Sequence, residues 1–320
     1  MAIDRSLEIP GQPLERIAEP PAGSAGVRGR RLGTPRLVVA CMRPGQWIKN
    51  AVVLAGVIFA GKVLDPASLA AAAAVTVAFC LASGASYLLN DVRDAEVDRH
   101  DPRTAGRPIA RGALSPRPAL VCGGVAAAAS LLIAGLVGDG SVAIVAAYLA
   151  LQIAYSYGLK RIIVIDLVAI ALGFVLRAAG GGVAIDVRVS PWLLIATASL
   201  ALFLGCSKRR GELARPLRPG VPARPVLARY SPVQLDRAIL ASTAATLAIY
   251  VGYAAYGAPT RWMLITVPFV VYGMLRVVTA IRSDPAQTAD PTLLILRDRH
   301  VLASVALWAA CATVVILGTA

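Results

Sequence analysis

The sequence contains few of the residues that build histidine or cysteine metal sites. Only two histidines, His100 and His300, occur in 320 residues, and they lie far apart in the chain. The five cysteines show no paired spacing and mostly lie inside apolar runs. We therefore expect neither a zinc site nor a disulfide framework, and we interpret the cysteines as small buried apolar residues. No heme or nucleic-acid motif occurs either, so no nucleic-acid partner is expected.

Acidic residues are also scarce: 18 Asp and Glu are outnumbered by 32 Lys and Arg, which gives a formal net charge of +14. Hydrophobic residues, in contrast, make up 57% of the chain, and the mean hydropathy is +0.68. These values exclude an ordinary soluble domain and predict an all-α polytopic membrane protein in a lipid bilayer. In that class an excess of basic residues first of all marks cytoplasmic loops, and only secondarily anionic ligands.

About nine apolar stretches have the ~17–23 residues needed to cross the ~30 Å hydrocarbon core. They are 46–62, 67–89, 117–137, 141–157, 162–183, 190–206, 235–256, 261–281 and 300–318. Residues 1–35 precede them and are rich in Pro, Gly and Arg, with no apolar run after a basic start, so they are not a signal peptide. We expect a disordered cytoplasmic tail at 1–35 and a transmembrane catalytic domain at 36–320.

Lysine and arginine gather in every second connection between these stretches. The connections after 67–89 and after 190–206 are rich in them, whereas those around Asp65 and Asp139 are short and contain almost none. By the positive-inside rule, this alternation predicts a cytoplasmic N-terminus and an outside C-terminus. We therefore expect a multi-pass protein of the plasma (inner) membrane whose charged motifs, and hence active site, face the cytoplasm.

An acidic motif, N-D-x-x-D-x-x-x-D from Asn90 to Asp98, directly follows the second stretch. On a continuing helix with ~100° per residue, Asp91, Asp94 and Asp98 fall within one narrow sector. Three like charges this close to hydrocarbon are costly unless a cation lies between them. Oxygen-only ligands suit Mg²⁺, which shares its coordination shell with phosphates. The motif therefore predicts catalytic, Mg²⁺-binding aspartates, with Asn90 as a further ligand; an ordinary solvated helix end is the alternative.

Other polar residues on the same side are candidate ligands for phosphate groups. They are Gln46 and Lys49 at the first stretch, Arg103, Arg107 and Arg111 after the acidic motif, Tyr157, Lys160, Arg161, Asp166 and Arg177 around the fifth stretch, and Ser207, Lys208, Arg209 and Glu212 after the sixth. Arginines can form forked hydrogen bonds to phosphate oxygens. For any single arginine, a purely topogenic charge is the alternative, and Lys49 could instead extend to the membrane interface.

Arg177 lies eleven residues after Asp166, about 16 Å along a helix at ~1.5 Å per residue. At that depth a charged side chain needs a partner, and a carboxylate inside the bundle is the simplest candidate. Gly180, Gly181 and Gly182 follow, and they predict either a close helix approach or a break.

On these residues the chain resembles the UbiA superfamily of intramembrane prenyltransferases. The acidic motif, the nine-stretch count and the cytoplasmic charge all match, over about residues 36–320. The resemblance implies a UbiA-like helical bundle with a polar cavity that faces the cytoplasm. Members of this superfamily carry a second Asp-rich motif after the sixth stretch, but here that place holds the net basic segment 207–212. A second Mg²⁺ site and a prenyl-diphosphate donor are therefore not expected.

The basic segment resembles one branch of the superfamily, the decaprenyl-phosphate phosphoribosyltransferases, together with three further motifs. These are R-P-x-Q-W-x-K-N at 43–50, Y-S-x-x-L-K-R at 155–161 and L-R-D-R at 296–299. The resemblance implies transfer of 5-phosphoribose from phosphoribosyl diphosphate (PRPP) to a polyprenyl (decaprenyl) phosphate, with release of diphosphate, for cell-wall arabinan synthesis. The candidate residues above would then bind PRPP and the lipid phosphate. The resemblance also suggests a homo-oligomer, such as a trimer.

Two other functions remain as alternatives. A UbiA-type prenyltransferase that uses a prenyl diphosphate and an aromatic acceptor would require a second carboxylate cluster. A transporter for an organic phosphate would line a path through the whole bilayer with charges, whereas here the charges gather on one side and no inverted repeat is visible.

Overall fold

The computed structural model describes residues 33–215, 227–284 and 297–319, and in these ranges the chain forms helices and no strand. This part of the chain contains eight helices that are long and apolar enough to cross a membrane. Their cores are α3 (Pro66–His100), α4 (Pro116–Val137), α5 (Asp139–Tyr157), α6 (Ile165–Ala184), α7 (Pro191–Ala214), α8 (Pro232–Gly252), α9 (Val267–Ser283) and α11 (Arg299–Leu317). The prediction of an all-α polytopic membrane protein is confirmed. The predicted tail lies almost entirely outside the described residues.

The stretch predicted as the first span, 46–62, is helical but is not one regular α-helix. The chain forms α1 (Thr34–Met42), a tighter 3₁₀ segment η1 (Pro44–Leu54) and the short α2 (Ala55–Phe59). Arg43 has a positive φ of 54° between α1 and η1. Because a proline disfavours the α conformation in the residue before it, α1 ends at this point. A largely apolar stretch of membrane-spanning length therefore does not imply a straight helix.

Local signals explain where the long helices begin. The Asp65 side chain accepts hydrogen bonds from the backbone N–H groups of Ala67 and Ser68, and Pro66 occupies the first turn of α3. The Ser68 hydroxyl hydrogen bond, above all, lowers the pKa of Asp65. At the start of α8, Ser231 and Gln234 form a reciprocal capping box. These bonds satisfy backbone donors that a helix leaves without intrahelical partners.

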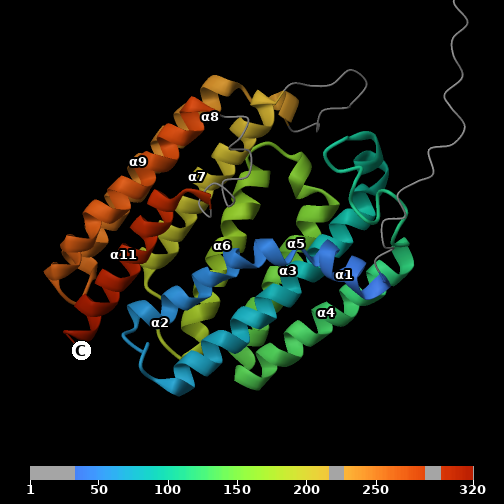
Figure 1. Cartoon of the computed structure of the whole chain (residues 1–320). Coiled ribbons are helices and arrows are strands. Elements are labelled where there is room, and N and C mark those ends of the chain that lie inside the picture. The colour runs from blue at the N-terminus through green and yellow to red at the C-terminus, as the bar shows by residue number, and fades with distance from the viewer. Residues whose placement is uncertain (1–32, 216–226, 285–296, 320) are drawn as a thin grey trace, which may run out of the picture. The chain divides into compact units, whose positions relative to one another are not determined.

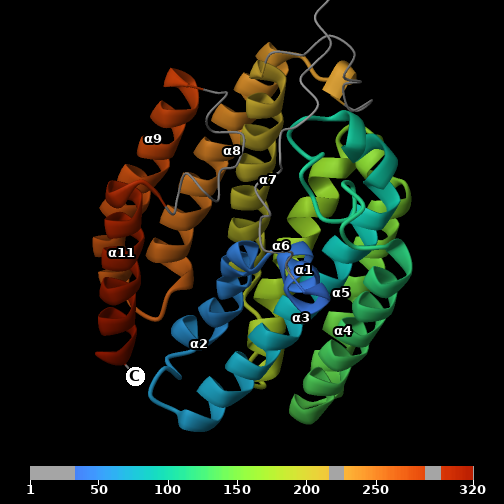
Figure 2. The ribbon, with the colours of Figure 1, turned by 45° about the vertical axis from the view of Figure 1, so that its right-hand side comes forward.

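Successive long helices alternate in direction, so that the charged connections lie at one end of the bundle (Figures 1 and 2). The loop after α3, the segment between α5 and α6, and the last turn of α7 all lie there. α3 has 35 residues, about 50 Å at ~1.5 Å per residue, which exceeds the ~30 Å hydrocarbon core. The helix therefore continues through the acidic motif, as predicted, and carries it toward this end.

The glycines of α6 allow η1 and α2 to pack very closely against it. A Cβ atom at Gly181 would lie 1.9 Å from the Val53 carbonyl oxygen, and one at Gly56 would lie 2.7 Å from the Gly181 carbonyl carbon. The close approach predicted from the glycine run is confirmed. The alternative of a break does not occur, because α6 continues to Ala184.

Gly181→Ala is expected to destabilise the fold by about 1–3 kcal/mol, because the added methyl group meets backbone atoms that cannot rotate away. The measurement is the midpoint of heat-induced aggregation in detergent. Gly135→Ala is the matched control, since a Cβ atom there has its nearest neighbour, a Val142 methyl group, at an ordinary 3.7 Å. Equal midpoints for the two variants would contradict the packing argument.

Candidate active site

Asp91 and Asp98 of α3 share one arginine from the following loop. The Nη1 atom of Arg107 lies 3.3 Å from Oδ1 of Asp91 and 2.6 Å from Oδ2 of Asp98. Arg43 donates a second hydrogen bond to Asp91 and lies over the ring of Tyr87, 4.8 Å from its centroid. Both carboxylates are almost completely buried, with 2% and 6% exposure for Asp91 and Asp98. They thus form an ion-pair cluster at the inner surface of the helix.

Asp94 and Asn90, on the neighbouring stripe of α3, face a lysine from another part of the chain. Lys160, in η2 (Leu159–Arg161), places its Nζ atom 2.6 and 2.8 Å from the two Asp94 carboxylate oxygens and 2.9 Å from Asn90 Oδ1. Asn90 also donates to Asp94, at 3.0 Å. The acidic motif and the basic Y-S-x-x-L-K-R motif are therefore brought together, although about 70 residues separate them.

A third cluster joins the first turn of α6 to the last two turns of α7. Arg209 donates to Asp166 at 2.7 Å, to Glu212 at 2.6 Å and to the Tyr155 hydroxyl at 3.3 Å. Tyr230 donates its hydroxyl to the other Asp166 oxygen at 2.6 Å. Burial, and then this hydrogen bond to Asp166, raise the pKa of Tyr230 well above its ordinary value. Asp166 and Arg209 are 0% and 1% exposed, so this pair is removed from solvent.

The loop after α3 lies close to the third cluster. Arg103 binds Asp101 in a forked arrangement, with nitrogen–oxygen distances between 2.6 and 3.1 Å. This hydrogen bonding raises the pKa of Arg103, and the negative charge of Glu212 contributes in the same direction. The three clusters and this loop thus all lie at the charged end of the bundle (Figures 1 and 2).

Arg177 has no carboxylate partner among the described residues, so that expectation is wrong. Its guanidinium donates to Asn50 at 2.6 Å, to the Tyr148 hydroxyl at 2.7 Å and to a carbonyl oxygen one turn earlier in α6. The rings of Tyr148 and Phe174 lie 4.5 and 5.4 Å from its central carbon. Neutral oxygens and aromatic rings can hold a buried guanidinium. Asp166, which precedes Arg177 on the same helix, binds Arg209 instead.

The remaining candidate residues occupy varied environments. Gln46 and Lys49 lie partly buried on η1, Lys208 is partly buried on α7, and Arg111, Tyr157 and Arg161 are exposed. Ser207 is fully buried and donates its hydroxyl to the Phe203 carbonyl oxygen at 2.7 Å. The Ser207 hydroxyl is therefore already used within the helix.

Several residues of the clusters were not among the sequence candidates. Arg43 and Asn50 belong to the R-P-x-Q-W-x-K-N motif, so the motif itself was the signal for them. Tyr148 lies in the middle of an apolar stretch and Tyr230 in a connection, and neither has a distinctive sequence context. Only the folded chain identifies those two.

The carboxylates of α3 match Mg²⁺ in chemistry, but basic side chains contact them in this structure. Within the described ranges, no three Asp, Glu, His or Cys side chains are arranged as a metal-binding group. However, one Arg107 nitrogen already lies within hydrogen-bond range of both Asp91 and Asp98, so a centre of positive charge fits between them. Oxygen donors on one helix face suit Mg²⁺. These residues therefore fit the ion, provided that Arg107 gives up one of its bonds.

Comparison with known proteins identifies the fold and the family. The family model described as the UbiA prenyltransferase family matches residues 50–297. A UbiA homologue from Archaeoglobus fulgidus, in a structure bound to GPP and Mg²⁺, has a TM-score of 0.68 and 20% identity, and the match covers 88% of this chain and 99% of that one. A structure of the same homologue bound to DMAPP and Mg²⁺ has a TM-score of 0.67, the same identity and the same coverage.

Curated relatives match at higher identity. The decaprenyl-phosphate phosphoribosyltransferase of Mycolicibacterium smegmatis is 34% identical over 279 residues, covering 82% of this chain and 86% of that protein. The protein of the same name from Corynebacterium glutamicum is 32% identical over 290 residues, covering 86% and 85%. The resemblance seen in the sequence motifs is confirmed: the chain belongs to the UbiA prenyltransferase family.

Proposed function

We propose that the chain transfers the 5-phosphoribosyl group of PRPP to a polyprenyl phosphate such as decaprenyl phosphate, and releases diphosphate. The observation that carries this proposal is the identity of 32–34% over more than four-fifths of the chain to enzymes named for that activity. The third cluster supports it. Where the prenyltransferases have a second acidic motif, Arg209 binds two carboxylates, and the neighbouring residues are basic.

In this proposal the clusters have different tasks. Asp91, Asp94 and Asp98, with Asn90, would hold Mg²⁺, which neutralises charge on the departing diphosphate when it is bound. Lys160 lies against Asp94 and is placed to donate to a phosphate oxygen near those carboxylates. The arginines of the loop after α3, of which Arg107 contacts Asp91 and Asp98, would bind the 5-phosphate of PRPP or the lipid phosphate by forked hydrogen bonds.

The reaction requires no general base. The bond from ribose C1 to the diphosphate oxygen breaks, and an oxygen of the lipid phosphate, already an anion, forms the new bond to C1 from the opposite face. An α-configured donor therefore gives a β-configured product. Most of the rate enhancement comes from positioning the two anionic substrates and from stabilising charge, which is the chemistry that fixed lysine and arginine side chains supply.

The orientation in the membrane belongs to the same proposal. The described parts of the connections rich in lysine and arginine lie at one end of the bundle (Figures 1 and 2), and by the positive-inside rule that end would face the cytoplasm. PRPP would then enter from the cytosol, and the lipid acceptor from the inner leaflet of the plasma membrane. The product would feed cell-wall arabinan synthesis.

The test is an incubation of membranes containing the protein with Mg²⁺, PRPP labelled in the ribose and polyprenyl phosphate. Label is expected to move into the organic phase, and the amount should rise with added polyprenyl phosphate. A parallel incubation with a labelled prenyl diphosphate and an aromatic acceptor should give no prenylated product. Transfer in the second incubation alone would support the prenyltransferase alternative and reject the phosphoribosyl transfer. Accumulation of unreacted label inside sealed vesicles would indicate a transporter.

A further inference from the structure

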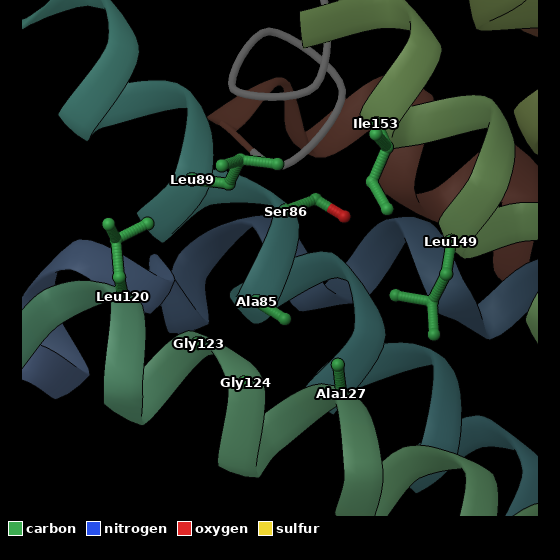
Figure 3. A pocket seen from close by; sticks show the side chains of 9 residues that line it. All are labelled: Ala85, Ser86, Leu89, Leu120, Gly123, Gly124, Ala127, Leu149 and Ile153. Carbon is green, nitrogen blue, oxygen red and sulfur yellow. The ribbon is translucent and has the colours of Figure 1, made fainter.

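A separate apolar groove lies between α3, α4 and α5 (Figure 3). Ala85, Ser86 and Leu89 of α3 form one wall, and Leu149 and Ile153 of α5 form another. The only polar atom among these side chains is the Ser86 hydroxyl, which donates to a backbone carbonyl oxygen of its own helix at 2.8 Å. The groove has a volume of about 170 Å³.

The third wall exists because α4 has small residues on the face that lines it. Leu120, Gly123, Gly124 and Ala127 follow the helical spacing of one face and line the groove together. A Cβ atom at Gly124 would meet no other atom within 4 Å, so the absence of a side chain there leaves open space that neighbouring residues do not fill. An apolar cavity of about 150 Å³ can take up benzene. The volume here thus suits one short branched hydrocarbon unit.

The groove lies next to one of the polar clusters along α3. Ser86, Asn90 and Asp94 follow each other at one-turn intervals along α3, so the groove lies one turn below the Asn90–Asp94–Lys160 contacts. On the neighbouring stripe, the exposed Arg93 lies above Leu89.

Arg93 contacts an aromatic ring one helical turn beyond the residues that line the groove. Its guanidinium lies 4.0 Å from the ring centroid of Tyr157, which is one helical turn beyond Ile153 on α5. On α4, Arg117 lies on the same helical face as Leu120, one turn closer to the charged end. An apolar groove with basic residues near one end is complementary to an amphiphile that has a hydrocarbon chain and an anionic head.

We propose that this groove holds the isoprenoid unit nearest the phosphate of the lipid acceptor, with Arg93 beside that phosphate. The inference rests on the proposed function, because it takes the acceptor to be a polyprenyl phosphate. The lipid would then lie along the outer face of α3 and α5, and its phosphate would reach the carboxylate and lysine cluster from the membrane side. PRPP would occupy the region between the three clusters.

The first experiment fills the groove in steps. Gly124→Ala, Gly124→Leu and Gly124→Phe are expected to raise the KM for polyprenyl phosphate progressively, reaching about tenfold or more for Phe, with less than about a twofold change in the KM for PRPP. Leu132→Phe is the control, because Leu132 is 72% exposed on the same helix and does not line the groove. A parallel rise in both KM values, or no change with Phe, would overturn the proposal.

The second experiment detects binding without turnover, so it remains informative even if phosphoribosyl transfer fails. A farnesyl phosphate that carries a photoreactive diazirine in its first isoprene unit is irradiated with the purified protein. Label is expected in peptides that contain 85–89, 120–127 and 149–153, and Gly124→Phe should reduce it by about tenfold. Excess unlabelled farnesyl phosphate should compete, and a phospholipid should not.

Three results of these experiments would reject the groove as an acceptor site. Label concentrated on other helices would place the isoprenoid chain elsewhere. Equal competition by a bulk phospholipid would show that the groove takes up any lipid chain. A change in oligomeric state caused by Gly124→Phe, measured by light scattering after size-exclusion chromatography, would show instead that a second copy of the chain packs on this face.

Discussion

Asp94→Asn is expected to lower kcat for phosphoribosyl transfer by about 10³-fold or more, while the protein remains folded. Asp94 is the motif carboxylate that faces Lys160 and Asn90, and its side chain keeps 25% exposure, so an amide of the same size fits its place. The substitution removes the negative charge that both a divalent cation and Lys160 require. Steady-state turnover in proteoliposomes, at saturating PRPP and polyprenyl phosphate, gives the change in kcat.

The matched control for this prediction is Glu96→Gln. Glu96 lies two residues further along α3, has 74% side-chain exposure and binds Arg99 on the outer surface. Its substitution should leave kcat within about twofold, because exposed ion pairs contribute little. EDTA should stop turnover by the unaltered protein, and added Mg²⁺ should restore it. Near-normal activity of Asp94→Asn at saturating Mg²⁺ would show that Asp94 is not a metal ligand in the reaction.

The fold and the acidic motif could be predicted because both depend on local sequence properties. Apolar runs of membrane-spanning length determine the long helices, and nothing between 67 and 98 interrupts helical geometry. The carboxylates of Asp91, Asp94 and Asp98 therefore had to lie on one side of α3. Their inward direction also follows from energetics, since three carboxylates facing acyl chains would be too costly.

The pairing of side chains could not be predicted in the same way. Asp91 and Asp98 meet Arg107 because the loop after α3 folds back, and Asp94 meets Lys160 because η2 ends beside it. Such contacts depend on the packing of helices that are distant in the sequence. The sequence indicates how many charged side chains there are and roughly how deep in the membrane each one lies. This information restricts the possible ion pairs but does not show which of them form.

Arg177 shows the same difficulty inside the membrane. Depth along α6 correctly indicated that its guanidinium needs partners, and a carboxylate was the expected type. The fold instead brings Asn50 and the Tyr148 hydroxyl within 2.6 and 2.7 Å of it. Asn50 reaches this position because η1 packs against the glycines of α6, and the tight winding of η1 has no signal in the sequence apart from Pro44.

Asp166→Asn is expected to destabilise the protein by about 3–5 kcal/mol, as is typical when one partner of a buried ion pair is removed. Asp166 and Arg209 have side-chain exposures of 0% and 2%, and Asp166 also accepts from Tyr230. Loss of the carboxylate would leave the Arg209 charge with Glu212 as its single anionic partner in this cluster. The first turn of α6, the last turn of α7 and the segment around Tyr230 would lose the contact that joins them.

A neighbouring ion pair on α7 provides the control for this effect. Arg210 binds Asp236 of α8 at 2.8 Å, but Asp236 has 49% side-chain exposure, so Asp236→Asn should cost only about 0–1 kcal/mol. The midpoints of heat-induced aggregation in detergent compare the two variants. If the buried pair is structural, Asp166→Asn combined with Arg209→Gln should cost less than the sum of the single variants, because no unpaired charge remains. Equal midpoints for Asp166→Asn and Asp236→Asn would instead mean that the Asp166 cluster contributes little to folding, and that its charges serve substrate binding.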